Sequence, residues 1–383
     1  MYTGERRGMK KFVLAISLIA LLLLSGWARE LPVLAGGGNT GSLARSADTG
    51  LTWTDWGTII DGQTSIWTLT YLDNGIFIAG GGATIGKVAR STDYGQTWTN
   101  LGAVIPGEAE IISEAYLGNG IVLIGTEEHA KIGRSTDYGR NWMDLGTIIA
   151  GETHITALSY LGDGIVLAGT DPGGKIARST DYGQNWTNLG TIIAGEAIAS
   201  LAYLGNGIVL AGTFTNAKIA RSTDYGQNWT DLGTVIAGET YVRKLVYLGN
   251  GIVLASTATN GKIARSTDYG LTWTDIGTII PGETGLRGLY YVGKGIVLTG
   301  SIPNGKVARS IDGGQTWTVL GTIVEGQIQV ISFAGQQQPS KQPGIIGRLL
   351  NWIRKIKSVV QKIVNGVGGS MSHYSPICVI VNV

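Results

Sequence analysis

The sequence predicts an all-β protein, a seven-bladed β-propeller made of four-stranded antiparallel blades. The first observation is a short pattern, SxDxGxxW, that occurs seven times. Its copies begin at Ser46, Ser91, Ser135, Ser179, Ser222, Ser266 and Ser310, so successive starts lie 45, 44, 44, 43, 44 and 44 residues apart. A fixed period of this size is typical of propellers and solenoids. The second observation is the glycine content, 61 of 383 residues, which suits short strands joined by tight turns.

One repeat, residues 151–189, shows how a blade is predicted to fold. We expect its strands at 155–161, 165–169, 175–179 and 186–189. These segments alternate apolar and polar side chains, are rich in β-branched residues and are separated by glycine-bearing turns, which indicates an antiparallel meander. Since one such sheet cannot bury both of its faces, neighbouring sheets must stack around an axis.

The two ends of the repeat array predict that the ring is closed by the C-terminal strand. The first repeat lacks a first strand, because residues 31–35 already resemble a second strand. After the last pattern, residues 327–335 resemble a first strand with no further repeat behind it. The C-terminal strand can therefore complete the N-terminal blade.

Composition divides the chain into a signal peptide at 1–28, the propeller at 29–335, a linker at 336–344 and a basic amphipathic helix with an apolar tail at 345–383. Lys10 and Lys11 precede an apolar run at 12–24 and small residues at the expected cleavage site, which predicts export. An uncleaved membrane anchor is the alternative, although the apolar run is short for a membrane span. Apolar residues recur on one face of 345–367 among basic ones, so this segment is predicted to contact a membrane surface or, alternatively, the propeller itself.

Charge is distributed unevenly along the chain. The formal net charge of +2 combines +3 in residues 1–28, −7 in 29–335 and +6 in 336–383. An acidic body argues against a nucleic-acid partner. Cys378 is the single cysteine, so no internal disulfide can form, and we expect a monomer held together by packing.

The repeated pattern has the chemistry of a turn. In one copy, Ser179 and Asp181 can hydrogen-bond the local backbone, Gly183 permits a positive φ, and Trp186 is placed to pack between blades. The equivalent aspartates are Asp48, Asp93, Asp137, Asp224, Asp268 and Asp312, and the equivalent tryptophans are Trp53, Trp98, Trp142, Trp229, Trp273 and Trp317. The arginine before each serine also repeats sevenfold, so we interpret the whole pattern as structural rather than catalytic.

The pattern resembles the Asp-box, or BNR, repeat known in sialidases, other glycoside hydrolases, sortilin-type receptors and photosystem II assembly factors. The resemblance covers about four fifths of the chain. It implies that each box lies in the turn between the third and fourth strands and acts structurally. Similarity to photosystem II assembly factors, seven-bladed propellers that hold a membrane-protein partner, implies a scaffold role.

The repeats differ from one another at one end of the predicted blades. Turns after first and third strands are nearly constant, whereas the loops after second strands vary, at 81–86, 126–130, 170–174, 213–217 and 301–305. Two positions at the start of the first strand vary as well. One is occupied by Trp67, Ile112, Thr156, Ala199, Arg243, Arg287 and Gln329, and the other by Ser65, Glu110, His154, Tyr241 and Gly285. We predict a binding face formed by Trp67, Glu110, His154, Tyr241, Arg243 and Arg287. Drift in solvated loops is the alternative explanation.

Two functions are compatible with this face. The resemblance allows a sialidase-like hydrolase of a carboxylate-bearing sugar, using arginines with Tyr241 and Glu110, but the Phe-Arg-Ile-Pro signature is missing and Arg29-Glu-Leu-Pro32 matches it only in part. Short loops also leave little to enclose a substrate. His129, His154 and His373 lack zinc-ligand spacing. We therefore predict a non-catalytic module that binds a protein or glycan, with no cofactor, metal or catalytic residue.

Overall fold

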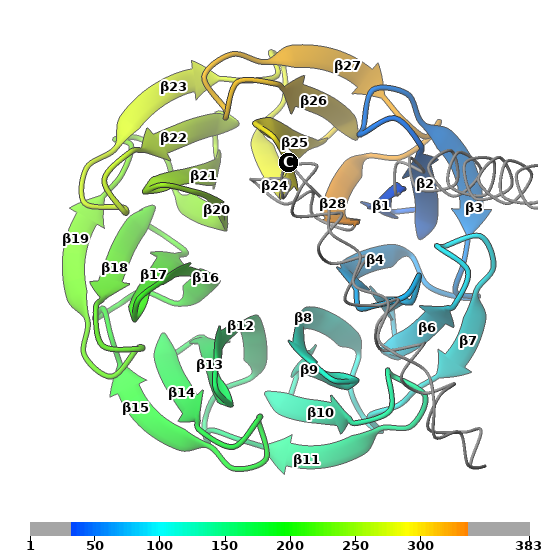
Figure 1. Ribbon diagram of the computed structural model, residues 1–383, viewed down its shortest axis with the longest axis horizontal. Helices are drawn as coiled ribbons and strands as arrows, with labels where there is room; N and C mark the ends of the chain where they lie inside the picture. The colour runs from blue at the N-terminus through cyan, green and yellow to red at the C-terminus, as the bar shows by residue number, and fades with distance from the viewer. Residues whose placement is uncertain (1–31, 336–383) are drawn as a thin grey trace, which may run out of the picture. The chain divides into compact units, whose positions relative to one another are not determined.

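The computed structural model describes residues 32–335, which form strands, turns and loops without a helix (Figure 1). The predicted all-β class is confirmed. The predicted signal peptide, linker, C-terminal helix and apolar tail lie outside the described residues, so the structure does not test them.

Extended antiparallel pairing groups the 28 strands of the described residues into blades of four around a central axis (Figure 1). Single-residue bridges, such as Gly82 with Glu110, also join some neighbouring blades. Blade 1 contains β28 (Gln329–Ala334), β1 (Val33–Gly38), β2 (Ser42–Ser46) and β3 (Thr54–Thr58). Blade 2 contains β4 (Ser65–Tyr71), β5 (Phe77–Gly82), β6 (Lys87–Ser91) and β7 (Thr99–Gly102), and blade 3 contains β8 (Glu110–Gly118), β9 (Ile121–Glu127), β10 (Lys131–Ser135) and β11 (Met143–Thr147). Blade 4 contains β12 (His154–Gly162), β13 (Ile165–Asp171), β14 (Lys175–Ser179) and β15 (Thr187–Thr191), and blade 5 contains β16 (Ile198–Gly205), β17 (Ile208–Thr213), β18 (Lys218–Ser222) and β19 (Thr230–Thr234). Blade 6 contains β20 (Tyr241–Gly249), β21 (Ile252–Ala258), β22 (Lys262–Ser266) and β23 (Thr274–Thr278), and blade 7 contains β24 (Gly285–Gly293), β25 (Ile296–Ile302), β26 (Lys306–Ser310) and β27 (Thr318–Thr322).

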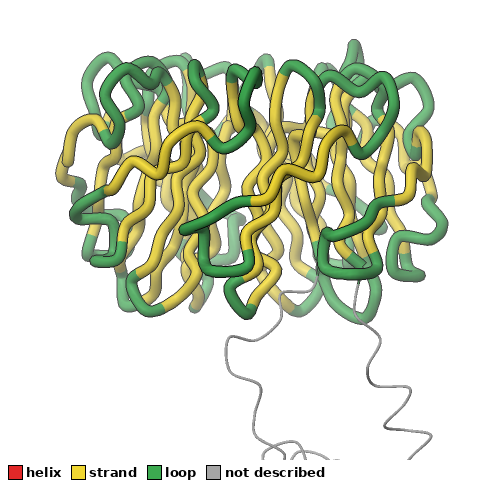
Figure 2. The backbone as a smooth tube through the Cα atoms, turned by 90° about the horizontal axis from the view of Figure 1, so that it is seen from above, coloured by secondary structure: helices red, strands yellow, loops and turns green. Residues whose placement is uncertain are grey.

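The loops gather at two opposite ends of the strands (Figure 2). At one end, which we call the constant rim, the Asp box touches the turn after the first strand, as where the Tyr182 N–H donates to Gly164 O at 2.9 Å. At the other end, the variable rim, the loop after the second strand touches the link between blades, as where the Ala130 N–H donates to Thr153 O at 2.9 Å. The predicted separation of constant and variable loops is therefore present in the structure.

The C-terminal strand closes the ring as predicted. β28 pairs antiparallel with β1, from Leu34 opposite Ala334 to Gly38 opposite Gln329. Across the same junction, Arg309 of blade 7 donates from Nε to Thr49 O of blade 1 at 3.1 Å. The first and last parts of the described chain are thus joined both within a blade and between blades.

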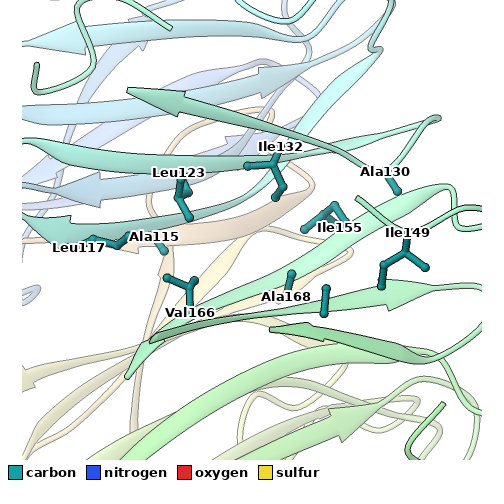
Figure 3. Packing of buried hydrophobic residues seen from close by; sticks show 10 residues of the cluster. Ala115, Leu117, Leu123, Ala130, Ile132, Ile149, Ile155, Val166 and Ala168 are labelled. Atoms are coloured by element: carbon teal, nitrogen blue, oxygen red, sulfur yellow. The ribbon is translucent and has the colours of Figure 1, made fainter. Parts of the chain in front are cut away.

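The apolar core lies between blades rather than within them. The cluster between blades 3 and 4 unites Leu123 and Ile132 from one blade with Ile155 and Val166 from the next, all fully buried (Figure 3). The Trp186 indole packs against the same cluster, partly buried. Equivalent clusters lie at the other junctions, including that between blades 7 and 1. Each blade is therefore stabilised by its neighbours through hydrophobic burial.

The Asp box fixes a tight turn through a repeated set of hydrogen bonds. In blade 4, the Ser179 hydroxyl donates to Asp181 Oδ1 at 2.8 Å and accepts from the Gly183 N–H at 2.9 Å. The Asp181 carboxylate accepts the N–H groups of Gln184 and Asn185. These bonds account for the box serine and aspartate without any catalytic role.

The box arginines tie each blade to the next. Their Nε atoms donate to a box carbonyl oxygen of the following blade at 2.6 to 3.1 Å, for Arg90, Arg134, Arg178, Arg221, Arg265 and Arg309. The seventh, Arg45, lies over the Trp56 ring, 5.2 Å from its centroid. Charged hydrogen bonds of this kind add a polar link outside the apolar clusters.

Neighbouring blades pack closely at one register of the second strand, which is glycine in six of the seven blades. A Cβ at Gly169 of β13 would lie 2.4 Å from Ile198 Cγ2 of blade 5. Blade 6 carries Ser256 at the equivalent register, and its hydroxyl is buried without a hydrogen bond. The distance between neighbouring blades is thus set by the smallest side chain available.

We expect Gly169→Ala to destabilise the protein by about 1–3 kcal/mol, because the added methyl overpacks the junction between blades 4 and 5. Ser256→Ala is the matched control and should be neutral or slightly stabilising, since it removes an unsatisfied buried hydroxyl. Urea unfolding of both variants measures the difference, and equal stabilities would refute the packing argument.

A chain lacking residues 327–335 loses β28 and leaves an open edge on β1. We expect its cooperative thermal transition to be abolished, because one blade and two interblade junctions become incomplete. A chain that ends at Gly335 keeps β28 and serves as the control. An unchanged melting curve in the deletion would disprove closure by this strand.

Candidate binding site at the channel mouth

Every blade carries a β-bulge at the start of its first strand, and the bulged residues surround the axis at the variable rim. In blade 4, for example, the register shifts between Ile155 and Ala157, which leaves Thr156 unpaired. The seven bulged residues are Trp67, Ile112, Thr156, Ala199, Arg243, Arg287 and Ile331. A bulge re-aims its side chain, and all seven line one cavity of about 430 Å³. We call this cavity the channel mouth.

The structure corrects one predicted position. Gln329 was expected to be equivalent to Trp67, but it pairs with Gly38 and matches Ser65 instead. Ile331 is the bulged residue of β28 and occupies the Trp67 position. It follows Trp317 by 14 residues, as Trp67 follows Trp53, so the expected equivalence was displaced by two residues.

The predicted binding-face residues come together at the channel mouth. Trp67, Glu110, His154, Arg243 and Arg287 all line it. Tyr241 lies beside them, with its ring centroid 4.4 Å from Arg243 Cζ. Sequence reasoning missed four further lining residues, namely Glu127, Asp171, Phe214 and Lys244. Glu127, Asp171 and Phe214 belong to the loops predicted to vary. The sequence therefore indicated the end of the blades at which they lie, but not that they line the cavity.

One side of the mouth is cationic and aromatic. Arg243 stacks over Tyr241 and lies 5.7 Å from the Phe214 ring, while Arg287 lies 5.6 Å from the Trp67 ring. The Nε atoms of both arginines are buried without a hydrogen bond, and neither forms an ion pair within residues 32–335. Burial, with the nearby Arg287 charge, lowers the pKa of Arg243 to about 10, so it stays cationic at neutral pH. These guanidinium groups are available to an anionic or carbonyl-rich ligand.

The mouth lining also carries three acidic residues, Glu110, Glu127 and Asp171. His154 Nε2 lies 3.2 Å from Glu127 Oε1. Burial and the Glu127 charge raise the pKa of Glu110 to about 7, although Trp67 and Arg287 oppose the shift. Burial also raises the pKa of Asp171. The mouth therefore carries charges of both signs, which suits an oriented partner with complementary charges rather than a symmetrical ligand.

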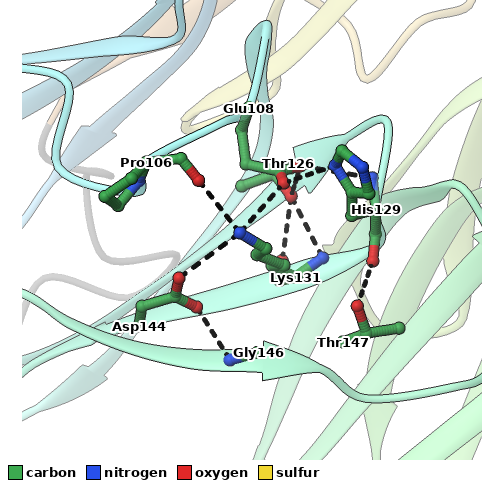
Figure 4. Close-up of polar contacts among 8 residues, drawn as sticks. All are labelled: Pro106, Glu108, Thr126, His129, Lys131, Asp144, Gly146 and Thr147. Carbon is green, nitrogen blue, oxygen red and sulfur yellow. Dashed lines mark hydrogen bonds and ion pairs between the residues drawn. The ribbon is translucent and has the colours of Figure 1, made fainter.

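A buried glutamate in the link before the blade anchors the variable loop beside the mouth. In blade 3, Glu108 accepts a hydrogen bond from Thr126 Oγ1 at 2.6 Å and lies 2.9 Å from His129 Nδ1 (Figure 4). Lys131 completes the cluster, with Nζ 3.4 Å from Glu108 Oε1. Glu152, Glu196, Glu239 and Glu283 form related contacts in the following blades. These buried glutamates, which the sequence analysis did not single out, hold loops of different sequence in the same position relative to the blade.

Below the mouth, a narrower cavity of about 180 Å³ contains a charge that the repeat does not predict. Glu114 occupies a position at which the other blades carry Leu69, Leu158, Leu201, Leu245, Leu289 and Phe333. Both of its carboxylate oxygens are buried without a hydrogen bond. Burial raises the pKa of Glu114 to about 7, and the Thr68 and Thr70 hydroxyls offset this only in part.

The raised pKa of Glu114 predicts a pH-dependent stability. The folded protein binds this proton more tightly than the unfolded chain, so its stabilising effect is complete below pH 4.5 and is lost as the pH rises through 7. The loss corresponds to roughly 3 kcal/mol. We expect Glu114→Leu to be more stable than the wild type at pH 8 and to lose this part of the pH dependence. Equal slopes of unfolding free energy against pH in the two proteins would contradict the assignment.

Within the described part of the chain, no group of three or more His, Cys, Asp or Glu side chains is arranged to hold a metal ion. No helix of residues 32–335 could cross a membrane. The lining of the mouth includes two arginines rather than the three that a sialidase-type carboxylate clamp requires.

The fold and the mouth define a β-propeller with a charged, aromatic cavity at the variable end of its axis. No protein-family model matches the chain, and no curated protein matches its sequence. Among solved structures, it is similar to "YCF48 bound to D1 peptide", with a TM-score of 0.54 and 21% identity over 66% of this chain and 81% of that chain. It is also similar to YCF48 from Cyanidioschyzon merolae (TM-score 0.52, 15% identity, 67% and 86% covered) and to the WD40 propeller domain of Doa1 (TM-score 0.55, 15% identity, 71% and 86% covered). At these identities, the similarity establishes the propeller fold alone.

Proposed function

We propose that this chain is an exported, non-catalytic Asp-box propeller that holds a protein partner at its channel mouth. The observation that carries the proposal is the pair of partly buried arginines, Arg243 and Arg287, which lie over aromatic rings and lack an ion-pair partner within residues 32–335. Aromatic residues and arginine are the types that dominate binding energy at protein interfaces. The acidic residues across the mouth would orient the partner.

Several further observations support the proposal. One similar structure is of YCF48 bound to a D1 peptide, so a propeller of related fold accommodates a peptide. The seven box patterns support membership of the Asp-box family, and the basic, apolar segment before residue 29 supports export. The basic residues of 345–367 would bring the scaffold to a membrane surface. We favour a protein over a glycan partner because one similar structure holds a peptide.

Photo-crosslinking in the source cells tests this proposal. A benzophenone amino acid replaces Phe214 at the mouth in one chain, and Leu271, which is 53% exposed in an Asp box, in a second chain. We expect a discrete protein adduct from position 214 and none from position 271. Arg243→Ala and Arg287→Ala should each weaken binding of the identified partner by about thirtyfold, the effect of losing a 2 kcal/mol hot spot.

Two results would contradict the proposal. An adduct that forms from position 271 but not from position 214 would move the interface to the constant rim. Turnover of a fluorogenic sialoside or other glycoside by the purified chain, lost in Arg287→Ala, would make the mouth an active site instead.

A further inference from the structure

Two charged side chains interrupt the repeat in the narrower cavity that continues from the mouth. Glu114 stands where the other blades carry leucine or phenylalanine. Lys244 stands where the other blades carry the small residues Thr68, Ser113, Ala157, Ser200, Gly288 and Ser332. Each substitution occurs once, and the two come from blades 3 and 6, which are not adjacent.

Neither charge is neutralised by the protein. The Glu114 carboxylate oxygens are buried without an ion pair in the described residues, and the nearby Thr68 and Thr70 hydroxyls compensate only in part for the burial. Lys244 forms no ion pair within the described residues, and Arg243, the nearest charge, is also positive. Burial of an unpaired charge costs several kcal/mol. A ligand that pairs with both groups would recover part of that cost.

Both charges line the same cavity of about 180 Å³. Six residues line this cavity and the mouth alike, namely Trp67, Ile112, Thr156, Ala199, Lys244 and Ile331, so a small molecule can enter from the variable rim. An apolar cavity of about 150 Å³ accommodates benzene, so this space suits a molecule of about six or seven non-hydrogen atoms. The remaining wall includes Leu69, Leu158 and Leu289, which can pack against methylene groups.

We propose that the channel binds a small zwitterion, an amino-acid-sized molecule whose ammonium group pairs with Glu114 and whose carboxylate pairs with Lys244. A simple cation would be repelled by Lys244 and Arg243, and a simple anion by Glu114. A neutral apolar molecule would leave both charges unpaired. The site lies deeper than the partner surface and adjoins it, because Glu114 lines only the inner cavity whereas Lys244 lines both.

Calorimetric titration of the full-length chain tests the proposal with glycine, β-alanine and γ-aminobutyrate as zwitterions. Methylamine, ethylamine, propylamine, acetate, propionate and butyrate are the matched single-charge probes. We expect saturable binding of at least one zwitterion, and binding at least about tenfold weaker for the amine and the carboxylate of the same length.

Three variants locate the site. Glu114→Leu and Lys244→Ser each introduce the residue type that other blades carry, so both should fold, and each should weaken zwitterion binding by at least about tenfold. Leu271→Ala, which changes an exposed Asp-box residue outside the cavity lining, should bind like the wild type. The proposal is overturned if no zwitterion binds, if an amine alone binds equally well, or if Glu114→Leu binds unchanged. Loss of the partner crosslink with retained zwitterion binding would refute only the proposed scaffold function.

Discussion

The structure depends on packing between blades around a closed ring. Its apolar clusters each draw side chains from two consecutive blades, so no blade buries its own faces. A stack of such sheets is complete only if the last blade meets the first. β28 provides this closure, both by pairing with β1 and by the Ser332 hydroxyl, which donates to Ile66 O of blade 2 at 3.0 Å. An all-β chain without an internal disulfide can thereby fold as one unit.

The same constraint separates structure from function along the axis. At the constant rim, the Asp boxes and their arginines repeat because each box forms the same turn and each arginine forms the same contact with the next blade. At the variable rim, buried glutamates hydrogen-bond the loops, so exposed loop residues can differ between blades while the loop backbone keeps its position. The bulge in each first strand then gives every blade one side chain directed at the axis. Because these bulged residues surround the axis, a different side chain in each blade is enough to form a specific binding surface.

Much of the fold could be predicted because it is repeated. Seven copies of one pattern reveal the strand order, and the two incomplete ends reveal how the ring closes. The binding-face residues could be predicted because they depart from the repeat, and five of the six line the mouth with Tyr241 beside them. Their chemistry, with unpaired arginines on aromatic rings, required the three-dimensional arrangement.

Two features were missed for different reasons. Gln329 was placed where Ile331 lies, although Ile331 follows Trp317 by the same 14 residues that separate Trp53 from Trp67. Glu114 lies within a strand that reads as ordinary, and its significance is visible only beside the leucines of the other blades. Aligning the repeats by structure supplies the missing signal, namely a charge at a position that is otherwise apolar.

Native-state hydrogen exchange tests the central claim that the ring is one cooperative unit closed by β28. The informative amides are those of β1 and β28, compared with those of β13 in the middle of the chain. If closure holds the ring together, all three strands open with the same free energy, that of global unfolding. Faster exchange of β1 and β28, at an opening free energy well below that of β13, would mean that the junction opens alone and that the closed ring does not govern stability.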